Sequence, residues 1–302
     1  MKRYKKFVLE AEKDITFEVS EGTSGELIIR ALNIATANVC STNYVNPPIP
    51  EGYKHVCGKW NNGFVIKRCS DGSQFVWIPV ESLDSNGTLD GEHFSEKFGR
   101  RNYMNNEFSD DEFNEALNYE LLKQFESVNK YGGFYISRYN ISKSLAGKPQ
   151  SVKGVMPWVN INFDDAKKVA STIEDNEAVK SHLTFGAEYD SVLEWFIKTE
   201  VKTFAEIAED STKWGNHRNT ENSLKKLVET GSRKKWCTNN IYDFAGNVDE
   251  WTQERNKSSY RVIRGGNYDF SGSNYPVAYR SNYCNPNFIF SNTGFRATLY
   301  IK

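Results

Sequence analysis

The C-terminal stretch from Gly265 to Arg296, GGNYDFSGSNYPVAYRSNYCNPNFIFSNTGFR, most limits the folds open to this chain. It places large aromatic rings among asparagines, serines and glycines. The order of these residues follows neither the 3.6-residue period of a helix nor the alternation of a strand. We therefore expect turns and short strands here, with more rings than one regular element can bury. The rings in question are Tyr268, Phe270, Tyr275, Tyr279, Tyr283, Phe288 and Phe290.

The central part of the chain has clearer periods. Apolar spacing predicts helices over Ser109–Val128, Asp164–Glu174 and Ala187–Lys198, with Ser109 as the N-cap of the first. The runs GFVIKR and QFVWIPV, joined by SDGS, predict a hairpin, and the alternating GGFYISRYNIS predicts a strand. Helices in the middle and an irregular second half indicate an α+β fold.

Residues 1–50 are expected to form a separate module. FVLEAEKDITFEV predicts a strand pair, and the apolar spacing of SGELIIRALNIATAN predicts an amphipathic helix over residues 24–38. Glu10 and Glu12 interrupt the apolar stretch too early for a signal peptide. The three prolines between Asn43 and Gly52 mark the boundary, so that residues 51–302 form the second domain.

Composition excludes several classes of protein. The 302 residues include 38 Lys and Arg against 39 Asp and Glu, a net charge of -1, which gives no reason to expect a nucleic-acid partner. The apolar runs are too short for insertion into a membrane, so the expected location is cytoplasmic or in a virion. The polar segment 84–93 lacks the spacing of an EF-hand and is expected to be a plain turn.

Cysteine and histidine give no clear metal pattern. The cysteines are odd in number and have no CxxC spacing, so we expect free thiols: Cys40, Cys57, Cys69, Cys237 and Cys284. The histidines stand singly, and each is expected to be a surface or structural residue: His55, His93, His182 and His217.

The densest motif is NNIYDFAGNVDEWTQE (Asn239 to Glu254), followed by RVIRGGNY and by GFR at Gly294–Arg296. Asp243 and Glu250 flank a glycine-containing turn, which can aim oxygen atoms at a hard cation such as calcium. The alternative is that the two acids only cap turns, and the spacing by itself favours this alternative.

The order of GNVDEW, RVIRGG and GFR resembles the formylglycine-generating (sulfatase-modifying factor) family, which has a variant of the C-type lectin fold. MPWVNINFDDAKKVA, HLTFGAEYDSVLEW and KWGNH resemble further family segments, so the similarity runs from about Phe75 to Ile301. In that family the GNxxEW stretch binds calcium. The resemblance implies calcium ligands at the side chains of Asp243 and Glu250 and at the carbonyls of Gly246 and Val248.

The resemblance does not extend to the catalytic centre. Catalytic members hold copper with two cysteines a few residues after RGG, where this chain has Phe270 and either Asn274 or Tyr275. Cys284 is a single thiol further along, and one thiolate cannot replace two. Iron-dependent relatives need a histidine trio that the scattered histidines do not provide. We therefore expect neither copper nor iron.

Tyr, Ser, Asn and Gly are the residues that binding loops favour. The segment also resembles the variable proteins of diversity-generating retroelements, some of which are phage receptor-binding proteins. Tyr279 and Phe295, beside Arg280 and Arg296, are expected in the core instead. The predicted contact residues are Tyr268, Asp269, Phe270, Ser271, Ser273, Asn274, Tyr275, Tyr283, Asn285, Asn287, Phe288 and Phe290.

Arg264 and Arg296 are expected to be structural ion-pair partners, and Trp158, Trp195 and Trp251 to be core residues. The function expected is that of a ligand-binding protein with a protein or glycan target, associated with a phage or prophage. Residues 1–50 would serve attachment, virion assembly or homo-oligomerisation. The alternatives are a divergent oxidoreductase of the family and a structural component with no ligand.

Overall fold

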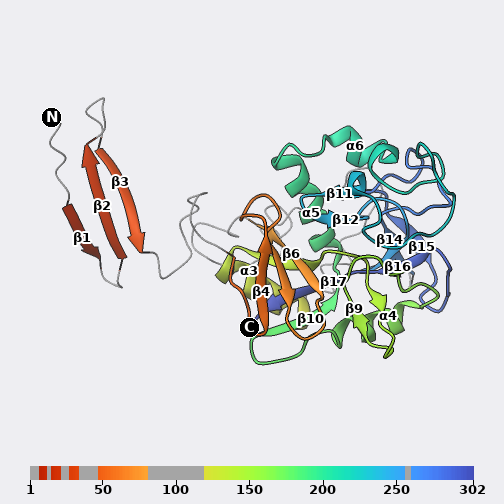
Figure 1. Ribbon diagram of the computed structural model, residues 1–302, viewed down its shortest axis with the longest axis horizontal. Coiled ribbons are helices and arrows are strands. Elements are labelled where there is room, and N and C mark those ends of the chain that lie inside the picture. Colours follow the sequence, from red (N-terminus) through yellow and green to blue (C-terminus); the bar gives the residue numbers. More distant parts are fainter. Residues whose placement is uncertain (1–6, 12–14, 22–26, 34–46, 81–118, 256–259) are drawn as a thin grey trace. The chain divides into compact units, whose positions relative to one another are not determined.

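The computed structural model describes residues 7–11, 15–21, 27–33, 47–80, 119–255 and 260–302 (Figure 1). The chain divides into two compact units, Met1–Cys40 and Ser41–Lys302. The segment 84–93, His93, Cys40 and the expected N-cap at Ser109 lie outside the described residues.

The first unit contains a three-stranded antiparallel sheet of β1 (Phe7–Ala11), β2 (Ile15–Glu21) and β3 (Leu27–Asn33), in that order. The strand pair expected in Phe7–Val19 is confirmed. The helix expected over residues 24–38 is wrong for Leu27–Asn33, because these residues pair with β2 from Glu21↔Leu27 onward. The adjacent β-branched residues Ile28 and Ile29 favour a strand, and the ladder to β2 outweighs the helical spacing.

The second unit is built around a six-stranded sheet in the order β10-β17-β7-β6-β5-β4, in which all neighbours are antiparallel. The C-terminal strand β17 is therefore inserted between β10 and β7. The predicted hairpin is confirmed, since Lys67 on β5 pairs with Gln74 on β6. The strands are β4 (Tyr53–Cys57), β5 (Val65–Arg68), β6 (Gln74–Pro79), β7 (Gly133–Ser137), β10 (Val179–Leu183) and β17 (Ala297–Ile301).

A second sheet carries the C-terminal motifs. Its order is β15-β14-β13-β16, with β13 and β16 parallel. The predicted absence of a helix from Gly265 to Arg296 is confirmed, because this stretch contains only turns and two of these short strands. The strands are β13 (Asp249–Arg255), β14 (Arg261–Arg264), β15 (Ser281–Cys284) and β16 (Thr293–Phe295). Two short ladders complete the described strands: β8 (Ser142–Lys143) with β9 (Pro149–Gln150), and β11 (Cys237–Thr238) with β12 (Ile241–Tyr242).

The helices of this unit are α3 (Tyr119–Tyr131), α4 (Phe163–Ser171), α5 (Gly186–Lys198) and α6 (Phe204–Ala208), with single turns at Thr212–Trp214 and Lys234–Trp236. The two later predicted helices are confirmed as α4 and α5. Asn162 caps α4, since its Oδ1 accepts from the Asp165 N–H at 2.8 Å. Among the helices that the structure describes, none is long and apolar enough to cross a membrane.

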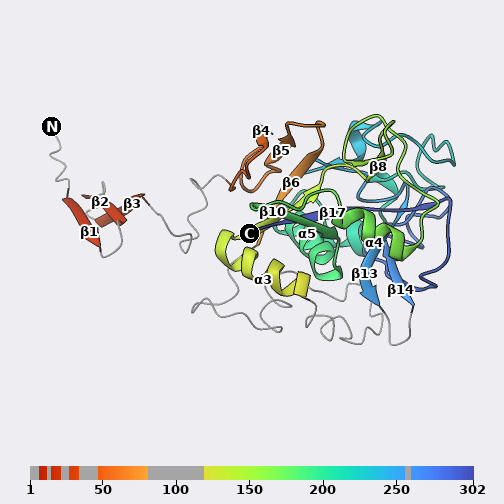
Figure 2. The ribbon, with the colours of Figure 1, turned by 90° about the horizontal axis from the view of Figure 1, so that it is seen from below.

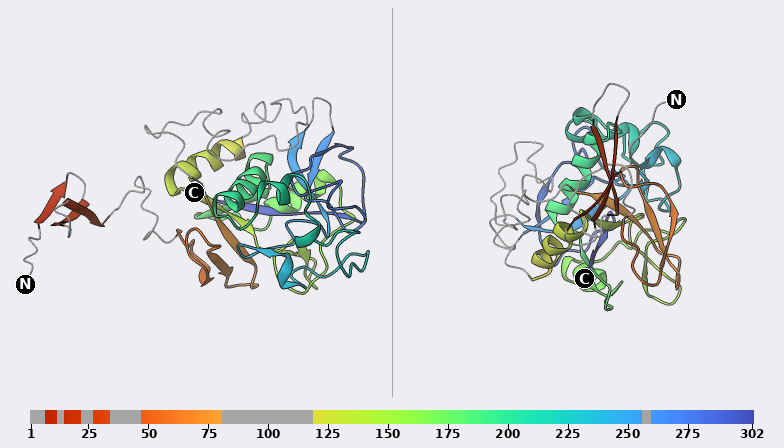
Figure 3. Two further views of the ribbon diagram at one scale, coloured as in Figure 1. Left: turned by 90° about the horizontal axis from the view of Figure 1, so that it is seen from above. Right: turned by 90° about the vertical axis from the view of Figure 1, so that its left-hand side faces the viewer.

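The alternating side chains of β6 and β7 separate two hydrophobic cores. Val76, Ile78 and Ile136 pack in one core with residues of α3 and α5, which lie together against the sheet in Figures 2 and 3. Phe75, Trp77 and Tyr135 belong to the other core, which includes residues of α4 and of β13.

The predicted core positions of Trp195, Trp251 and Phe295 are confirmed, because all three are buried. Trp158 and Tyr279 are only half-buried. Trp158 packs against Phe295 on the edge of the second core, with ring centroids 6.3 Å apart, and the rest of its indole borders a surface pocket.

Candidate functional site

The turn that leads into β13 is held in an unusual backbone conformation. Asp243, Gly246 and Asn247 all have positive φ angles, of 53°, 72° and 67°. A Cβ at Gly246 would lie 2.6 Å from backbone atoms of Asn216, so this close approach requires glycine. Asn216 and Gly246 form a parallel bridge, which places KWGNH beside the GNVDEW motif.

Asp243 and Glu250 are buried, and each has one oxygen engaged. Asp243 Oδ2 accepts from the Gly231 N–H at 2.7 Å and from the Thr230 hydroxyl at 3.0 Å. Glu250 Oε1 accepts from Arg296 Nε at 2.6 Å and from Asn140 Nδ2 at 2.7 Å. The other oxygen of each carboxylate has no hydrogen-bond partner among the described residues.

Burial raises the pKa of Asp243, and it raises the pKa of Glu250 to about 7 against the opposing effect of Arg296. The charge of Asp243 also raises the pKa of Glu250, so the two carboxylates share one electrostatic environment. Two buried, unengaged carboxylate oxygens fit a hard cation, which would relieve the cost of burying them.

The remaining ligands of such a cation would be carbonyl oxygens. The Gly246 carbonyl already accepts the Val248 N–H at 2.9 Å. The Val248 carbonyl oxygen lies 3.7 Å from the position that a Cβ atom would take at Gly265. No group of three or more His, Cys, Asp or Glu residues that could hold a metal occurs in the part of the chain that the structure describes. Carbonyl and water oxygens, which calcium accepts, would have to supply the remaining ligands of any cation held by these two acids.

Next to this turn, four buried charged residues form a closed set of ion pairs, which we call the ion-pair clamp: Asp190, Glu254, Arg264 and Arg280. Arg264 binds Asp190 at 2.9 Å and Glu254 at 3.2 Å. Arg280 binds Glu254 at 2.6 Å and also Asp190. The side chains are at most 2% exposed. The structural ion-pair roles predicted for Arg264 and for Arg296, which pairs with Glu250, are confirmed.

The clamp fixes both ends of the irregular segment from Gly265 to Tyr279. Arg264 is the last residue of β14, and Arg280 directly precedes β15. The same two acids on α5 and β13 therefore hold the chain before Gly265 and after Tyr279. Buried charges outside the segment therefore hold both of its ends.

Residues 268–275, which we call loop 1, lie inside this clamped segment. The rings of Phe270 and Tyr275 are in contact with centroids 4.6 Å apart, and Tyr275 contacts Tyr279 at 5.0 Å. By the resemblance described above, Phe270 is expected at the first cysteine position of the family pattern and either Asn274 or Tyr275 at the second.

Loop 1 rests on residues 211–219 through its backbone. The Gly272 carbonyl accepts from Ser211 N at 3.0 Å, and the Phe270 carbonyl accepts from Arg218 N at 2.9 Å. Asn219 Oδ1 accepts from Gly272 N at 3.0 Å. These bonds involve no loop 1 side chain, so the side chains of Phe270, Ser273 and Asn274 stay exposed.

His217 lies beneath loop 1 and is fully buried. A Cβ atom placed at Gly215, Gly266 or Gly272 would lie 3.0 Å or less from an atom of its ring. Glycine at these three positions therefore makes room for the imidazole. Neither ring nitrogen has a hydrogen-bond partner of ordinary geometry among the described residues. Burial lowers the pKa of His217 to about 4, against smaller opposing effects of Asp210 and the Asn267 backbone, so the ring is neutral at pH 7.

Residues 285–291, which we call loop 2, carry the most exposed large apolar side chains of the region. Phe288 is 55% and Ile289 59% exposed. Phe290 contacts Phe288 at 5.8 Å and the buried Trp251 at 6.3 Å, and so anchors the loop to the core. Ile289 was not among the predicted contact residues, although it lies within the same polar stretch.

Loop 1 begins, and loop 2 ends, beside the residues that lead into β13. The Asn247 carbonyl accepts the Tyr268 N–H at 3.3 Å, at the base of loop 1. The Asp249 N–H donates to the Asn292 carbonyl at 2.9 Å, at the end of loop 2. Asn267 Nδ2 also donates to the Asp249 carboxylate. The start of β13 therefore joins both loops to the turn that carries the two acids.

The predicted contact residues fall into three groups. Asp269, Phe270, Ser273, Asn274, Asn287 and Phe288 are exposed. Tyr268, Ser271, Tyr275, Asn285 and Phe290 are half-buried. The side chain of Tyr283 lies outside the described residues.

Cysteine chemistry at this site is weak. In the described part of the chain the cysteines are free: Cys57, Cys69, Cys237 and Cys284. Cys284 is buried, and burial raises its pKa to about 11, so it is a thiol and not a thiolate at pH 7. A neutral buried thiol is a poor ligand and a poor nucleophile.

Three comparisons with known proteins were informative to different degrees, and the family match is the one that bears on the motifs. A solved structure titled "Crystal Structure of CarF" is similar, with 17% sequence identity and a TM-score of 0.42, and the match covers 57% of this chain and 88% of that one. Curated proteins give no match. Residues 102–300 match the family described as the sulfatase-modifying factor enzyme 1-like domain. The chain therefore belongs to the sulfatase-modifying factor enzyme 1-like family.

Proposed function

We propose that this chain is a ligand-binding member of its family, which presents loop 1 and loop 2 on a C-type lectin-like scaffold to a protein or glycan. The observation that carries the proposal is the aromatic pair Phe270 and Tyr275 on a loop whose ends are held by buried ion pairs. Exposed rings on a rigid support are typical of binding surfaces, because they give contact area at a low cost in conformational entropy.

The test is a comparison of three variants against candidate targets, including host-cell surface extracts. Tyr275→Ala and Phe288→Ala should each weaken binding at least tenfold, because rings near the centre of an interface carry most of the binding energy. Cys284→Ser should leave binding unchanged. If binding survives both aromatic substitutions, the loops are not the binding surface.

The alternative function, a divergent oxidoreductase, is supported by family membership alone. It requires copper or iron bound in stoichiometric amount and an activity that depends on Cys284. Metal analysis of purified protein after incubation with copper under reducing conditions separates the two functions. Stoichiometric copper that is lost in Cys284→Ser would favour the enzyme.

We further propose that loops 1 and 2 are diversified by a retroelement in a phage or prophage. The mixture of Tyr, Asn, Ser, Asp and Phe at exposed positions supports this, because adenine-directed changes in Asn codons produce it. The nucleotide sequence around the gene is the test. A near-copy of the segment Arg264–Arg296, differing at adenines and lying beside a reverse transcriptase, would identify the contact residues. Its absence would indicate a fixed binding surface.

We also propose that Asp243 and Glu250, with the carbonyls of Gly246 and Val248, hold a structural calcium ion. A ligand that binds only the native state stabilises it by about 2.7 kcal/mol at a hundredfold excess over Kd. EDTA should therefore lower the Tm of calcium-loaded protein, and Glu250→Gln should abolish that shift. Asp249→Asn, which changes the neighbouring buried acid, should keep it. An unchanged Tm in protein shown beforehand to contain calcium would contradict the proposal.

The first unit is proposed to serve attachment or assembly. In its sheet β1 and β3 are the edge strands, and edge strands offer backbone groups to a partner strand. Light scattering of the full chain at several concentrations would reveal self-association, and a monomer throughout would exclude homo-oligomerisation.

A further inference from the structure

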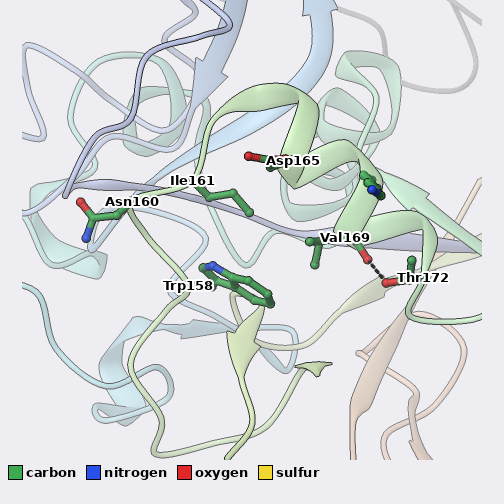
Figure 4. A pocket seen from close by; sticks show the side chains of 7 residues that line it. Trp158, Asn160, Ile161, Asp165, Val169 and Thr172 are labelled. Atoms are coloured by element: carbon green, nitrogen blue, oxygen red, sulfur yellow. Dashed lines mark hydrogen bonds between the residues drawn. The ribbon is translucent and has the colours of Figure 1, made fainter. Parts of the chain in front are cut away.

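A pocket of about 410 Å³ lies between the Trp158–Ile161 segment and α4 (Figure 4). This volume falls within the range of about 300–1,000 Å³ that is usual for small-ligand sites. Figure 4 shows the ring of Trp158 opposite Val169, with Asn160 and Thr172 towards opposite ends. The lining residues are Trp158, Asn160, Ile161, Asp165, Lys168, Val169 and Thr172.

The lining divides into an apolar floor and a polar rim. Trp158, Ile161 and Val169 are half-buried or buried and form the floor. Asn160, Asp165, Lys168 and Thr172 are exposed and form the rim. The ammonium group of Lys143 lies 4.9 Å from the Trp158 ring centroid, a cation–π contact that restrains the indole.

The rim offers every kind of hydrogen-bonding group. Asp165 accepts only, Lys168 donates only, and the Asn160 amide and the Thr172 hydroxyl do both. The Thr172 hydroxyl donates to the Val169 carbonyl at 2.8 Å, which leaves its oxygen free to accept. A ligand with many groups that both donate and accept would satisfy this rim.

A sugar ring matches both parts of the pocket. Its C–H face packs on an aromatic ring, while its hydroxyls donate and accept around the edge. A nucleotide would need several cations for its phosphates, and Lys168 is the single cation among the lining residues. An apolar peptide anchor would use the floor but would leave the polar groups of the rim without a partner in the ligand.

The pocket adjoins loop 2. The Phe290 carbonyl accepts the Asn160 N–H at 2.9 Å, and the Pro286 carbonyl accepts the Phe163 N–H at 3.0 Å. The Trp251 indole, which contacts Phe290, donates to the Ile161 carbonyl at 3.0 Å. The backbone that shapes the pocket is thus bonded to the backbone of the proposed binding surface.

We propose that this pocket is a saccharide subsite, in which one sugar ring stacks on Trp158 and bonds to Asn160, Asp165 and Lys168. The proposal rests on the proposed function in one respect, because it makes the ligand of the binding surface a glycan. The backbone bond between Asn160 and Phe290 places loop 2 next to the bound ring.

Saturation-transfer NMR on the full chain tests this, with methyl glycosides of glucose, galactose, mannose and N-acetylglucosamine and with sialic acid as probes. At least one probe should receive saturation. Lys168→Ala and Asn160→Gly should each weaken its binding roughly five- to tenfold. Asn160→Gly removes the amide yet suits the positive φ of 57° at this position. Trp158→Ala should abolish binding, provided that the variant is folded.

Lys148→Ala is the matched control, since Lys148 is an exposed lysine outside the pocket lining, and it should bind like the wild type. The absence of binding for all probes, or binding that survives both Lys168→Ala and Asn160→Gly, overturns the subsite. If saccharides bind here but Tyr275→Ala and Phe288→Ala leave target binding intact, the subsite stands and the loop proposal fails. If no saccharide probe binds but Tyr275→Ala and Phe288→Ala weaken target binding, the subsite fails and the loop proposal stands.

Discussion

The two arginines of the ion-pair clamp, Arg264 and Arg280, lie close to the two loops in the sequence, yet different interactions determine their positions. Arg264 and Arg280 are buried, and their positions are fixed by two buried acids. Phe270 and Phe288, a few residues away, expose 39% and 55% of their surface. Charged residues are inside and aromatic residues outside, the reverse of the usual distribution. The difference shows that buried charges flanking the loops hold the chain there, whereas the rings of Phe270 and Phe288 are left exposed to solvent.

The largest effect is expected from breaking the clamp. Asp190→Ala should lower the free energy of unfolding by about 3–5 kcal/mol, because it leaves two buried arginines short of a partner. Urea unfolding followed by tryptophan fluorescence measures the change. Asp269→Ala, which removes an exposed acid from loop 1, is the control and should change stability by less than about 0.5 kcal/mol. Equal losses in the free energy of unfolding would show that the clamp does not stabilise the fold more than an exposed side chain of loop 1 does.

The support of loop 1 should depend on pH through His217. Its pKa is about 4 in the folded protein and about 6.5 in the unfolded chain, so between these values the unfolded chain binds the extra proton. Stability should therefore fall by about 3 kcal/mol from this group as pH decreases from 6.5 to 4. His217→Asn removes this titration. The free energy of unfolding of the wild type should therefore approach that of the variant as pH falls. A constant difference would show that His217 does not titrate in this way.

Glycine should be required at the clamped base of loop 1. Gly266 has φ +71°, and a Cβ there would lie 2.6 Å from the Tyr275 carbonyl. Gly154 has φ +78°, with nothing within 4 Å of such a Cβ. Both Gly→Ala changes strain the backbone, but Gly266→Ala should cost about 1–3 kcal/mol more because of the clash. Thermal unfolding of the two variants isolates the steric part, and similar losses would show that loop 1 can move aside.

The smallest effect on stability is expected at the tip of loop 2. Phe288→Ser should change the free energy of unfolding by no more than about 0.5 kcal/mol, because its ring is mostly exposed. Phe290→Ser, which loses the contact with Trp251, should cost about 1 kcal/mol or more. A large loss at Phe288 would mean that its ring supports the fold and is not kept for binding.

Much of the fold was predictable because it depends on local patterns. The hairpin of β5 and β6, the helices α4 and α5 and the irregular C-terminal stretch all follow from apolar spacing and turn residues. The N-terminal helix was wrongly predicted because apolar residues at helical spacing also fit a strand when a neighbouring strand supplies the ladder. Trp158 was wrongly placed in the core, since no sequence pattern indicates which side of an indole is covered.

The sequence by itself determined the family motifs, the absence of a cysteine pair after RGG and the aromatic character of the C-terminal stretch. These are properties of residue types and their order, which need no fold to be read. The tertiary structure decided that Asp190, far away on α5, binds both arginines that flank loop 1. It also decided that loop 2 borders a pocket beside α4. Both results depend on contacts between segments distant in sequence, which form only when the two cores bring the sheets and helices together.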